Sequence, residues 1–296
     1  MTIRVLHWEA FSTQPGQGNP AGVVLDAASL SDRQMQEIAR LMGFNETAFL
    51  LPSQVADLRL RYFTPGHEVD LCGHATVASL LARHAATREA LPRQLTFETL
   101  AGVLPMALSH GEDGNPLVHM QQARAQFADF AGDRAALAGA LGIDPEDIAT
   151  QWPTLYGSTG LWTLVVPIRT LAAIQRMRPS SDRFPDILQE MPRVSVHPFC
   201  LETLDPTAHL HARHFSSPYS GTVEDPVTGT ASGVLGAYYD KFIESSRQGP
   251  LVVEQGTEVG RNGRVQVWAT PVDDSYEVSI AGTGCPVAEV NLEIDE

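Results

Sequence analysis

Residues 72–76 read Cys-Gly-His-Ala-Thr and residues 228–232 read Thr-Gly-Thr-Ala-Ser, and these two stretches decide the fold. Each of them opens an uncharged segment of small and apolar residues. A helix that is apolar or small on every side is buried on every side. We therefore predict two central helices, each wrapped by a sheet, with Gly233 and Gly236 allowing close packing in the second.

A second similarity lies upstream of each stretch. Residues 58–63 read Leu-Arg-Leu-Arg-Tyr-Phe, residues 210–215 read Leu-His-Ala-Arg-His-Phe, and both alternate as strands do. A turn signal follows each one. Two copies of strand, turn and helix indicate a duplication into two similar halves, and chance similarity of short strings is the alternative.

The remaining sequence alternates between strands and amphipathic helices. Ser31 and Gln34 form a capping-box pattern, and Gly43 is suited to end the helix that they begin. Strand patterns outnumber helix patterns, so the predicted class is α+β. The strand candidates are residues 5–10, 21–25, 47–51, 117–121, 161–168, 251–253, 265–269 and 276–280.

Length and charge narrow the function classes. The chain has 296 residues, which at roughly 150 per domain suggests about two domains. Its 35 acidic and 20 Lys or Arg residues give a net charge of −15, so phosphate backbones and anionic lipids would repel it. No signal-peptide core opens the sequence, and three cysteines cannot form a disulfide framework. We expect a cytoplasmic protein with no nucleic-acid or membrane partner.

Glu46 is the first candidate for chemistry. It opens the apolar run at residues 47–51, where an ionised side chain is costly unless it is paired. A carboxyl in such surroundings exchanges protons nearer neutral pH, which suits a general acid/base. The alternative is a strand-edge glutamate whose carboxylate lies in water.

Cys72, Gly73 and His74 form the second candidate. Gly73 lets the backbone approach a ligand closely, and the N–H groups that open a helix bind anions. His74 would donate a hydrogen bond or relay a proton there, or else be satisfied by backbone carbonyls. Cys72 is either a nucleophile or base, or a small buried apolar residue.

The second predicted helix is preceded by Glu224 and Asp225 and opens at Gly229. Acidic residues before a helix are favoured by its dipole, which explains their charge but not the match with the first half. Two helix N-termini with convergent polar groups predict one cleft between the halves, suited to a small anionic ligand.

Several motifs point away from metal and nucleotide chemistry. His209, His211 and His214 have ligand-like spacing, but on a strand the third points away from the first two, and no acid cluster accompanies them. A Gly-x-Gly pair at residues 282–284 is followed by Pro286 where a dinucleotide-binding helix would begin. The sequence contains no P-loop and no Gly-x-Ser-x-Gly elbow. We expect no metal and no cofactor.

Longer strings follow one another along most of the chain: Gly18-Asn19-Pro20-Ala21-Gly22-Val23-Val24, Asn45-Glu46-Thr47-Ala48-Phe49, Arg61-Tyr62-Phe63-Thr64-Pro65, Glu68-Val69-Asp70-Leu71-Cys72-Gly73-His74-Ala75-Thr76 and Glu224-Asp225-Pro226-Val227-Thr228-Gly229-Thr230-Ala231. In these strings the sequence resembles the PhzF-like family, the phenazine-biosynthesis isomerases and their relatives. The strings stand in family order, and together they are highly specific.

The resemblance implies a diaminopimelate-epimerase-like fold. That fold has two pseudo-symmetric halves, each a β-barrel-like sheet around a central helix, with the active site in the cleft between them. It also implies that the last strand returns to the first half, which would comprise residues 1–122 and about 281–296, with residues 123–280 as the second half. Homodimers are usual in the family, and its named reaction isomerises trans-2,3-dihydro-3-hydroxyanthranilate without a cofactor.

The resemblance also implies roles for individual residues. The family's catalytic glutamate falls on Glu46, its substrate-contacting histidine on His74, its aspartate on Asp225 and its helix-opening hydroxyl on Thr230. Glu46 would move a proton between two ring carbons, while His74 and Asp225 hold or polarise the polar groups of the substrate. The expected substrate-binding residues are Gly73, Gly229, Thr230 and Asn45.

Two other functions stay open. A two-thiol racemase or epimerase of a small amino acid needs a cysteine before each helix-opening glycine, but the chain has Cys72 in the first half and Thr228 in the second. A non-catalytic binding relative would not need the intact acid/base residues. The sequence also departs from the common family pattern, with Thr230 and Asn45 where serine is frequent and Glu9 where aspartate is usual.

Overall fold

The computed structural model describes residues 1–111, 113–245 and 247–295, which form two compact units. Unit 1 comprises residues 1–121 and 281–296, and unit 2 comprises residues 122–280. Glu296, the last residue of the predicted first half, lies outside the described residues. Within the described ranges, no helix is both long enough and apolar enough to cross a membrane.

Unit 1 consists of β1 (Thr2–Ala10), β2 (Asn19–Val24), α1 (Asp32–Met42), β3 (Thr47–Leu51), β4 (Leu58–Phe63), β5 (Glu68–Val69), α2 (Gly73–Thr87), β6 (Arg93–Thr99), β7 (Gly102–His110), β8 (Pro116–Gln121) and β17 (Gly284–Glu293). The strands pair in the order β17–β1–β2–β3–β4–β6–β7–β8, and β5 pairs with the end of β4. The β2–β3 and β4–β6 pairs are parallel, and the others are antiparallel.

Unit 2 contains β9 (Gln126–Asp129), α3 (Arg134–Leu141), β10 (Leu155–Ser158), β11 (Trp162–Pro167), α4 (Leu171–Arg176), α5 (Phe184–Ile187), β12 (Ser195–Cys200), β13 (Leu210–Ala212), α6 (Gly229–Phe242), β14 (Leu251–Gln255) and β15 (Gly263–Val272), with 3-10 turns at Pro145–Asp147, Ser181–Arg183 and Thr257–Val259. β16 (Ser275–Gly282) begins in unit 2, and its last two residues belong to unit 1. The pairing order from β9 to β15 follows the sequence, and the β11–β12 and β13–β14 pairs are parallel.

The two units repeat one pairing pattern. Successive pairs from β1 to β7 in unit 1 are antiparallel, parallel, antiparallel, parallel and antiparallel. The pairs from β10 to β15 in unit 2 follow the same sequence of directions. The strand topology therefore confirms the two similar halves that the sequence predicts.

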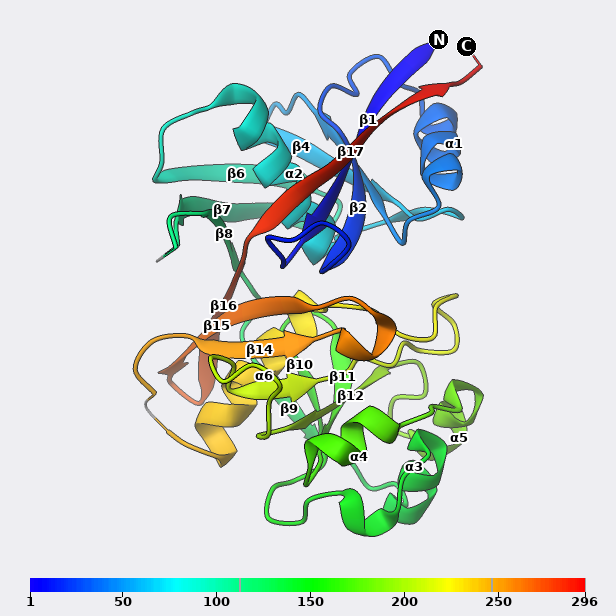
Figure 1. Cartoon of the computed structure of the whole chain (residues 1–296), viewed down its shortest axis with the longest axis vertical. Helices are drawn as coiled ribbons and strands as arrows, with labels where there is room; N and C mark the ends of the chain where they lie inside the picture. Colours follow the sequence, from blue (N-terminus) through cyan, green and yellow to red (C-terminus); the bar gives the residue numbers. More distant parts are fainter. Residues whose placement is uncertain (112, 246, 296) are drawn as a thin grey trace. The chain divides into compact units, whose positions relative to one another are not determined.

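A buried helix lies at the centre of unit 1. Every residue of α2 from His74 to Ala82 is buried, which covers more than two full turns. The helix packs against β1, β2, β3, β8 and β17, strands from both ends of the pairing order (Figure 1). The sheet therefore curls around α2, as the absence of charged residues from the first turns of that helix predicts. The helix α1 packs on the outside against β3 and β4.

The second central helix, α6, depends on its glycines for close packing in unit 2. It contacts β10 and β15, and its residues from Ala231 to Tyr238 are all buried. A Cβ atom at Gly236 would lie 2.3 Å from Cγ1 of Val267 on β15. Such a distance is far below van der Waals contact, so the prediction that glycine allows close packing here is confirmed.

The run at residues 210–215 is not one alternating strand, so that prediction was wrong. β13 ends at Ala212, and Phe215 then makes isolated bridges with Val196 and Glu224. All six residues except His214 are buried, because both faces of this run are covered. The equivalent run of unit 1, residues 58–63, is β4 from end to end.

Residues 47–51 form β3 with the predicted ends, and the other predicted strands are present with at least one end altered. The capping box at Ser31 and Gln34 is confirmed with Gly43 as C-cap. The strands that the residue patterns did not reveal are β5, β6, β7, β9, β10, β12 and β17, of which the last was expected from the family resemblance alone. Of these, β7, β12 and β17 each contain a proline, which is disfavoured inside sheets and hides the strand pattern.

The two ends of the described chain lie side by side in unit 1 (Figure 1). β1 lies between β2 and β17, and it pairs with β17 over its whole length. The amino group of Met1 donates a hydrogen bond to the Ile294 carbonyl at 2.7 Å. β17 begins at Gly284 and continues through Pro286, so a strand, not a nucleotide-binding helix, follows the Gly-x-Gly pair.

Candidate active site

Glu46 and His74, candidates from two separate stretches, come together in unit 1. Glu46 precedes β3, and its backbone carbonyl accepts a hydrogen bond from Gly22 of β2 at 3.3 Å. Its side chain is 20% exposed, and Oε2 lies 3.4 Å from Nε2 of His74. The parallel pairing of β2 with β3 thus brings a carboxylate to the first turn of α2.

His74 is a neutral imidazole at pH 7. Burial lowers the pKa of its ring to about 4, although a hydrogen bond to the Pro20 backbone opposes that shift. Since proline has no N–H, the ring is the donor and the Pro20 carbonyl is the acceptor. The second ring nitrogen of a neutral imidazole is an acceptor. The contact with Glu46 therefore joins a carboxyl group to a neutral ring and is not an ion pair.

The starts of the two central helices lack side-chain caps. Cys72 and Thr228, the N-cap residues of α2 and α6, make no capping hydrogen bond to their helices. By contrast, Ser31, Asp133 and Thr170 cap α1, α3 and α4 through side-chain oxygens. The first N–H groups of α2 and α6 are therefore left to other acceptors, such as the carboxylate of a small molecule.

Two polar residues of β1, Glu9 and His7, were not selected as candidates by the sequence analysis. Glu9 is 1% exposed, and its carboxylate accepts a hydrogen bond from the Gly16 backbone at 2.6 Å. The ring of His7 stacks on Phe44, two residues before Glu46, with ring centroids 4.4 Å apart. The sequence signal for Glu9 is an acidic residue within the apolar end of a strand.

Neighbouring groups hold Asp225 at the start of α6 in unit 2. Its carboxylate accepts a hydrogen bond from the Thr228 hydroxyl, and its backbone carbonyl accepts one from Gln255 at 2.8 Å. Gln255 is 1% exposed at the end of β14, and its side chain also accepts a hydrogen bond from the Thr228 backbone at 3.2 Å. Sequence analysis missed Gln255, because one amide at the end of an apolar strand carries no distinctive signal.

The remaining predicted residues are divided between the units. Asn45 is half-buried in the bend between α1 and β3, and Gly73 is the first residue of α2. In unit 2, Gly229 is buried as the first residue of α6, and the half-buried Thr230 accepts a hydrogen bond from Thr159 on its backbone carbonyl at 3.0 Å. The structure thus joins Glu46 to His74 directly and sets Asp225 three residues before the N-cap of α6.

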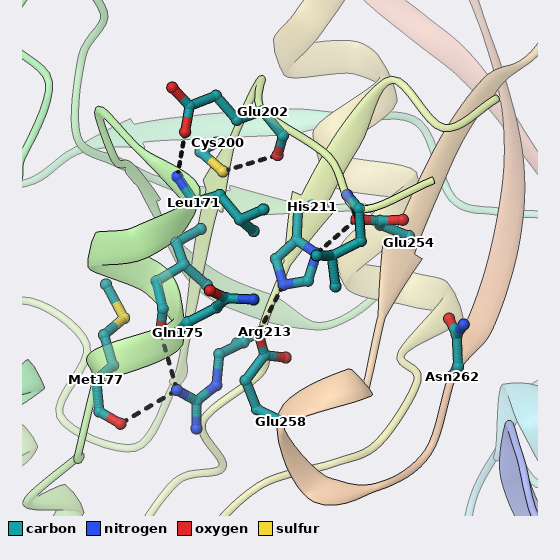
Figure 2. Close-up of polar contacts among 12 residues, drawn as sticks. Leu171, Gln175, Met177, Cys200, Glu202, His211, Arg213, Glu254, Glu258 and Asn262 are labelled. Carbon is teal, nitrogen blue, oxygen red and sulfur yellow. Dashed lines mark hydrogen bonds and ion pairs between the residues drawn. The ribbon is translucent and has the colours of Figure 1, made fainter. Parts of the chain in front are cut away.

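A buried polar cluster joins β13, β14 and the 3-10 turn at Thr257–Val259 (Figure 2). His211 is 0% exposed, with Nδ1 at 2.7 Å from Glu254 and Nε2 at 2.9 Å from Glu258. Burial alone lowers the pKa of this imidazole, but the hydrogen bonds and charges of the two glutamates outweigh burial and raise the pKa to about 9. The ring is therefore protonated at pH 7 and bridges two carboxylates.

The three spaced histidines do not form one ligand set. His209 contacts Arg247, His211 bridges its two glutamates, and Nδ1 of His214 lies 3.2 Å from Nδ1 of His197. The expectation that no acids accompany these histidines was wrong for His211, whose partners come from positions far along the chain. Within the described part of the chain, the side chains whose spacing could hold a metal ion are Glu46, Cys72 and His74.

The amino-acid sequence of the chain is similar to those of known proteins. Residues 8–290 match the family of phenazine biosynthesis-like proteins. An uncharacterized isomerase of Bacillus subtilis, YfhB, is 48% identical over 279 residues, which cover 94% of each chain. The trans-2,3-dihydro-3-hydroxyanthranilate isomerase of Pseudomonas aeruginosa is 30% identical over 283 residues, 95% of this chain and 96% of that one.

Solved structures confirm the predicted fold class. A PhzF-family phenazine biosynthesis protein of Bacillus anthracis has a TM-score of 0.96 at 47% identity, covering 99% of this chain and 100% of that one. A hydroxyproline epimerase from Agrobacterium vitis shares the fold with a TM-score of 0.62 at 12% identity, covering 98% and 91% of the two chains. The chain belongs to the phenazine biosynthesis-like protein family, and the two sequence relatives described above are named isomerases.

Proposed function

We propose that this protein is a cofactor-independent isomerase that moves a proton on a small carboxylate-bearing substrate, with Glu46 as general acid/base. The observation that carries the proposal is the 3.4 Å contact between Oε2 of Glu46 and Nε2 of His74 beside the uncapped start of α2. This arrangement puts a proton acceptor, a neutral hydrogen-bonding group and anion-binding N–H groups in one place.

The proton transfer balances without any other reagent. The Glu46 carboxylate takes a proton from a carbon next to an unsaturated system, and the electron pair of that C–H bond moves into the conjugated double bonds. The resulting Glu46 carboxylic acid then returns the proton to a second carbon. His74 stays neutral, and its second ring nitrogen accepts a hydrogen bond from a donor group of the substrate and so orients it. The N–H groups at the start of α2 are the donors that stabilise the negative charge that develops between the two steps.

The residues of unit 2 are proposed to bind the substrate. Gly229 opens the uncapped α6, and Thr230 adds a hydroxyl in its first turn. Asp225 is held by Thr228 and Gln255, so its carboxylate keeps one position without the help of a substrate. A group that is fixed in advance loses little conformational freedom on binding, which favours affinity.

The substrate class follows from the relative with a named reaction. That relative isomerises trans-2,3-dihydro-3-hydroxyanthranilate, a cyclic acid with a conjugated ring, and it is 30% identical to this chain. We therefore propose a dihydro-hydroxyanthranilate-like cyclic acid as the first compound to test. Close analogues that lack the amino or the hydroxyl group would then define the specificity.

A two-base racemase is the runner-up, and one contact argues against it. In such an enzyme a second thiol would stand at position 228, where this chain has Thr228. The Thr228 hydroxyl donates a hydrogen bond to the Asp225 carboxylate, so it is engaged as a donor. A hydroxyl is also a far weaker acid than a thiol, which makes Thr228 a poor proton acceptor from carbon.

Glu46→Gln tests the proposal directly. Glutamine keeps the shape and hydrogen-bonding reach of the side chain but cannot take up a proton, so turnover should fall about 10²–10⁴-fold while binding changes little. The measurements are turnover, substrate binding by calorimetry, and incorporation of solvent deuterium into the product. The exposed Glu37 on α1 gives a matched control, because Glu37→Gln should leave all three unchanged.

Two outcomes would contradict the mechanism. A Glu46→Gln protein that turns over the substrate at the wild-type rate would exclude Glu46 as the base. Cys72→Ala should keep most of the turnover, with some loss of stability from packing, so a loss as deep as that of Glu46→Gln would favour the epimerase instead. His74→Ala should weaken binding as well as turnover, because it removes a group proposed to contact the substrate.

A further inference from the structure

Three different ligating side chains converge at the start of α2. Nε2 of His74 lies 3.4 Å from Oε2 of Glu46 and 3.9 Å from Sγ of Cys72. One ligand atom from each residue can be chosen so that all three lie within 4.8 Å of one another. The group combines a thiol, an imidazole and a carboxylate, three side chains that bind zinc.

These separations fit a tetrahedral zinc ion. With bonds of about 2.3 Å to sulfur and about 2.0–2.2 Å to nitrogen or oxygen, tetrahedral geometry places ligand atoms about 3.3–3.6 Å apart. The Glu46–His74 separation of 3.4 Å lies in that range, and the Cys72–His74 separation of 3.9 Å needs a small movement. The Glu46 side chain is 20% exposed, so its carboxylate can rotate to bring an oxygen within the tetrahedral distance of Sγ of Cys72.

The ligand chemistry selects zinc over magnesium or calcium. Thiolate and imidazole are borderline-soft donors that suit zinc, whereas magnesium and calcium prefer sets made of oxygen atoms. A thiolate and a carboxylate together neutralise a divalent charge, which a site this buried requires. Cys72 and His74 are 8% and 7% exposed, and three protein ligands leave a fourth position for water.

We propose that Glu46, Cys72 and His74 bind one zinc ion reversibly, and that zinc bound there inhibits the protein. Binding exchanges the thiol proton of Cys72 for a sulfur–zinc bond and releases that proton to solvent. The same ion ties up the Glu46 carboxylate, so it cannot accept a proton from carbon. The inhibition rests on the proposed function, whereas the zinc binding does not.

The binding test uses cobalt(II) as a coloured substitute for zinc on the reduced wild-type protein. We expect one equivalent of cobalt to give a near-ultraviolet thiolate-to-metal absorption band, which zinc then displaces. Cys72→Ser should remove the band, and Cys72→Ser or His74→Gln should weaken zinc binding more than about tenfold in a chelator competition. Zinc should also raise the unfolding temperature of the wild-type protein but not that of Cys72→Ser.

Cys285 offers a matched control in the same unit. It is 7% exposed, against 8% for Cys72, so the two thiols are equally buried. Cys285→Ser should keep both the cobalt band and the zinc affinity. If the band survives in Cys72→Ser, is lost equally in Cys285→Ser, or never forms in the wild-type protein, the zinc site is excluded. His74→Gln, which leaves all thiols in place, decides the question if Cys72→Ser does not fold.

An activity measurement separates this proposal from the proposed function. Wild-type isomerisation should fall in proportion to zinc occupancy and recover fully when a chelator removes the ion. Activity that persists with the site fully occupied by zinc would overturn the inhibition. If zinc binds as described but no isomerisation is found for any cyclic acid, the proposed function fails and the metal site stands.

Discussion

The Arg61–Glu68 pair of unit 1 and the Arg213–Glu224 pair of unit 2 occupy matching places in the repeated strand runs. Both are bidentate, with nitrogen–oxygen distances of 2.6 and 2.7 Å in the first and 2.8 and 2.7 Å in the second. Both guanidinium groups also lie over the phenylalanine two residues further on. Exposure separates them, since the side chains of the first pair are 13% and 23% exposed and those of the second 5% and 8%.

A second matching pair differs more. Arg59 of β4 lies opposite Glu98 of β6, and His211 of β13 lies opposite Glu254 of β14, in equivalent parallel pairings. The Arg59–Glu98 contact is 3.6 Å long between side chains that are 37% and 28% exposed, whereas His211 and Glu254 are fully buried. The repeated scaffold therefore fixes where a cationic side chain contacts a carboxylate. The burial of each pair by its surroundings decides how much the pair contributes to the free energy of unfolding.

Replacing the two arginines tests this comparison with the largest expected effect. Arg213→Met leaves Glu224 buried without its cation, so the free energy of unfolding should fall by about 3–5 kcal/mol. Arg61→Met should cost about 1–2 kcal/mol, because water reaches Glu68 more easily. Urea unfolding measures both changes.

The double variant Arg213→Met/Glu224→Leu is the control for that test. It removes the stranded carboxylate together with its partner and should recover much of the loss. Equal losses in the Arg213→Met and Arg61→Met proteins would show that burial is not what distinguishes the two units.

Replacing His211 or Arg59, the cations of the second matching pair, by glutamine should lower the free energy of unfolding by a smaller amount. His211→Gln removes the positive charge between two buried carboxylates and keeps at most one of the two hydrogen bonds that the imidazole makes, so we expect a loss of about 2–3 kcal/mol in unfolding free energy. Arg59→Gln should change it by less than about 1 kcal/mol, because its ion pair is long and exposed. A loss in the Arg59→Gln protein as large as that in His211→Gln would break the comparison.

The smallest expected effect is on the pH dependence of stability. Glu254 and Glu258 hold the folded-state pKa of His211 at about 9, above its ordinary value of 6.5. The stabilisation is therefore complete below about pH 6.5 and is lost as the pH rises toward 9. At the acid end, the pKa of both glutamates lies below its ordinary value of 4.5 despite burial, so their contribution is lost as the pH falls below that value.

Urea unfolding of the wild-type protein and of His211→Gln from pH 5 to 9.5 measures this dependence. The wild-type stability should fall more steeply between pH 6.5 and 9 than that of the variant. Parallel curves for the two proteins would mean that the buried imidazolium does not contribute to the pH dependence.

Sequence patterns predict the two central helices because absence of charge over a whole segment has one structural meaning. They also single out Glu46 and His74, but not their contact, which depends on the pairing of β2 with β3. The partners of His211 lie 43 and 47 residues downstream, and such long-range contacts leave no local pattern. β17 escapes prediction for a related reason: its prolonged pairing with β1 overrides the glycine and proline that it contains.

The pairing of β1 with β17 also sets an order of assembly during translation. β1 leaves the ribosome before unit 2 is made, whereas β17 emerges only after all of unit 2. Unit 2 can therefore complete its sheet while β1 still presents an unpaired edge, which is a site for wrong associations. Since α2 also packs against β17, the unit that carries Glu46 and His74 closes after unit 2, and the proposed site is not complete in a nascent chain until β17 has been made.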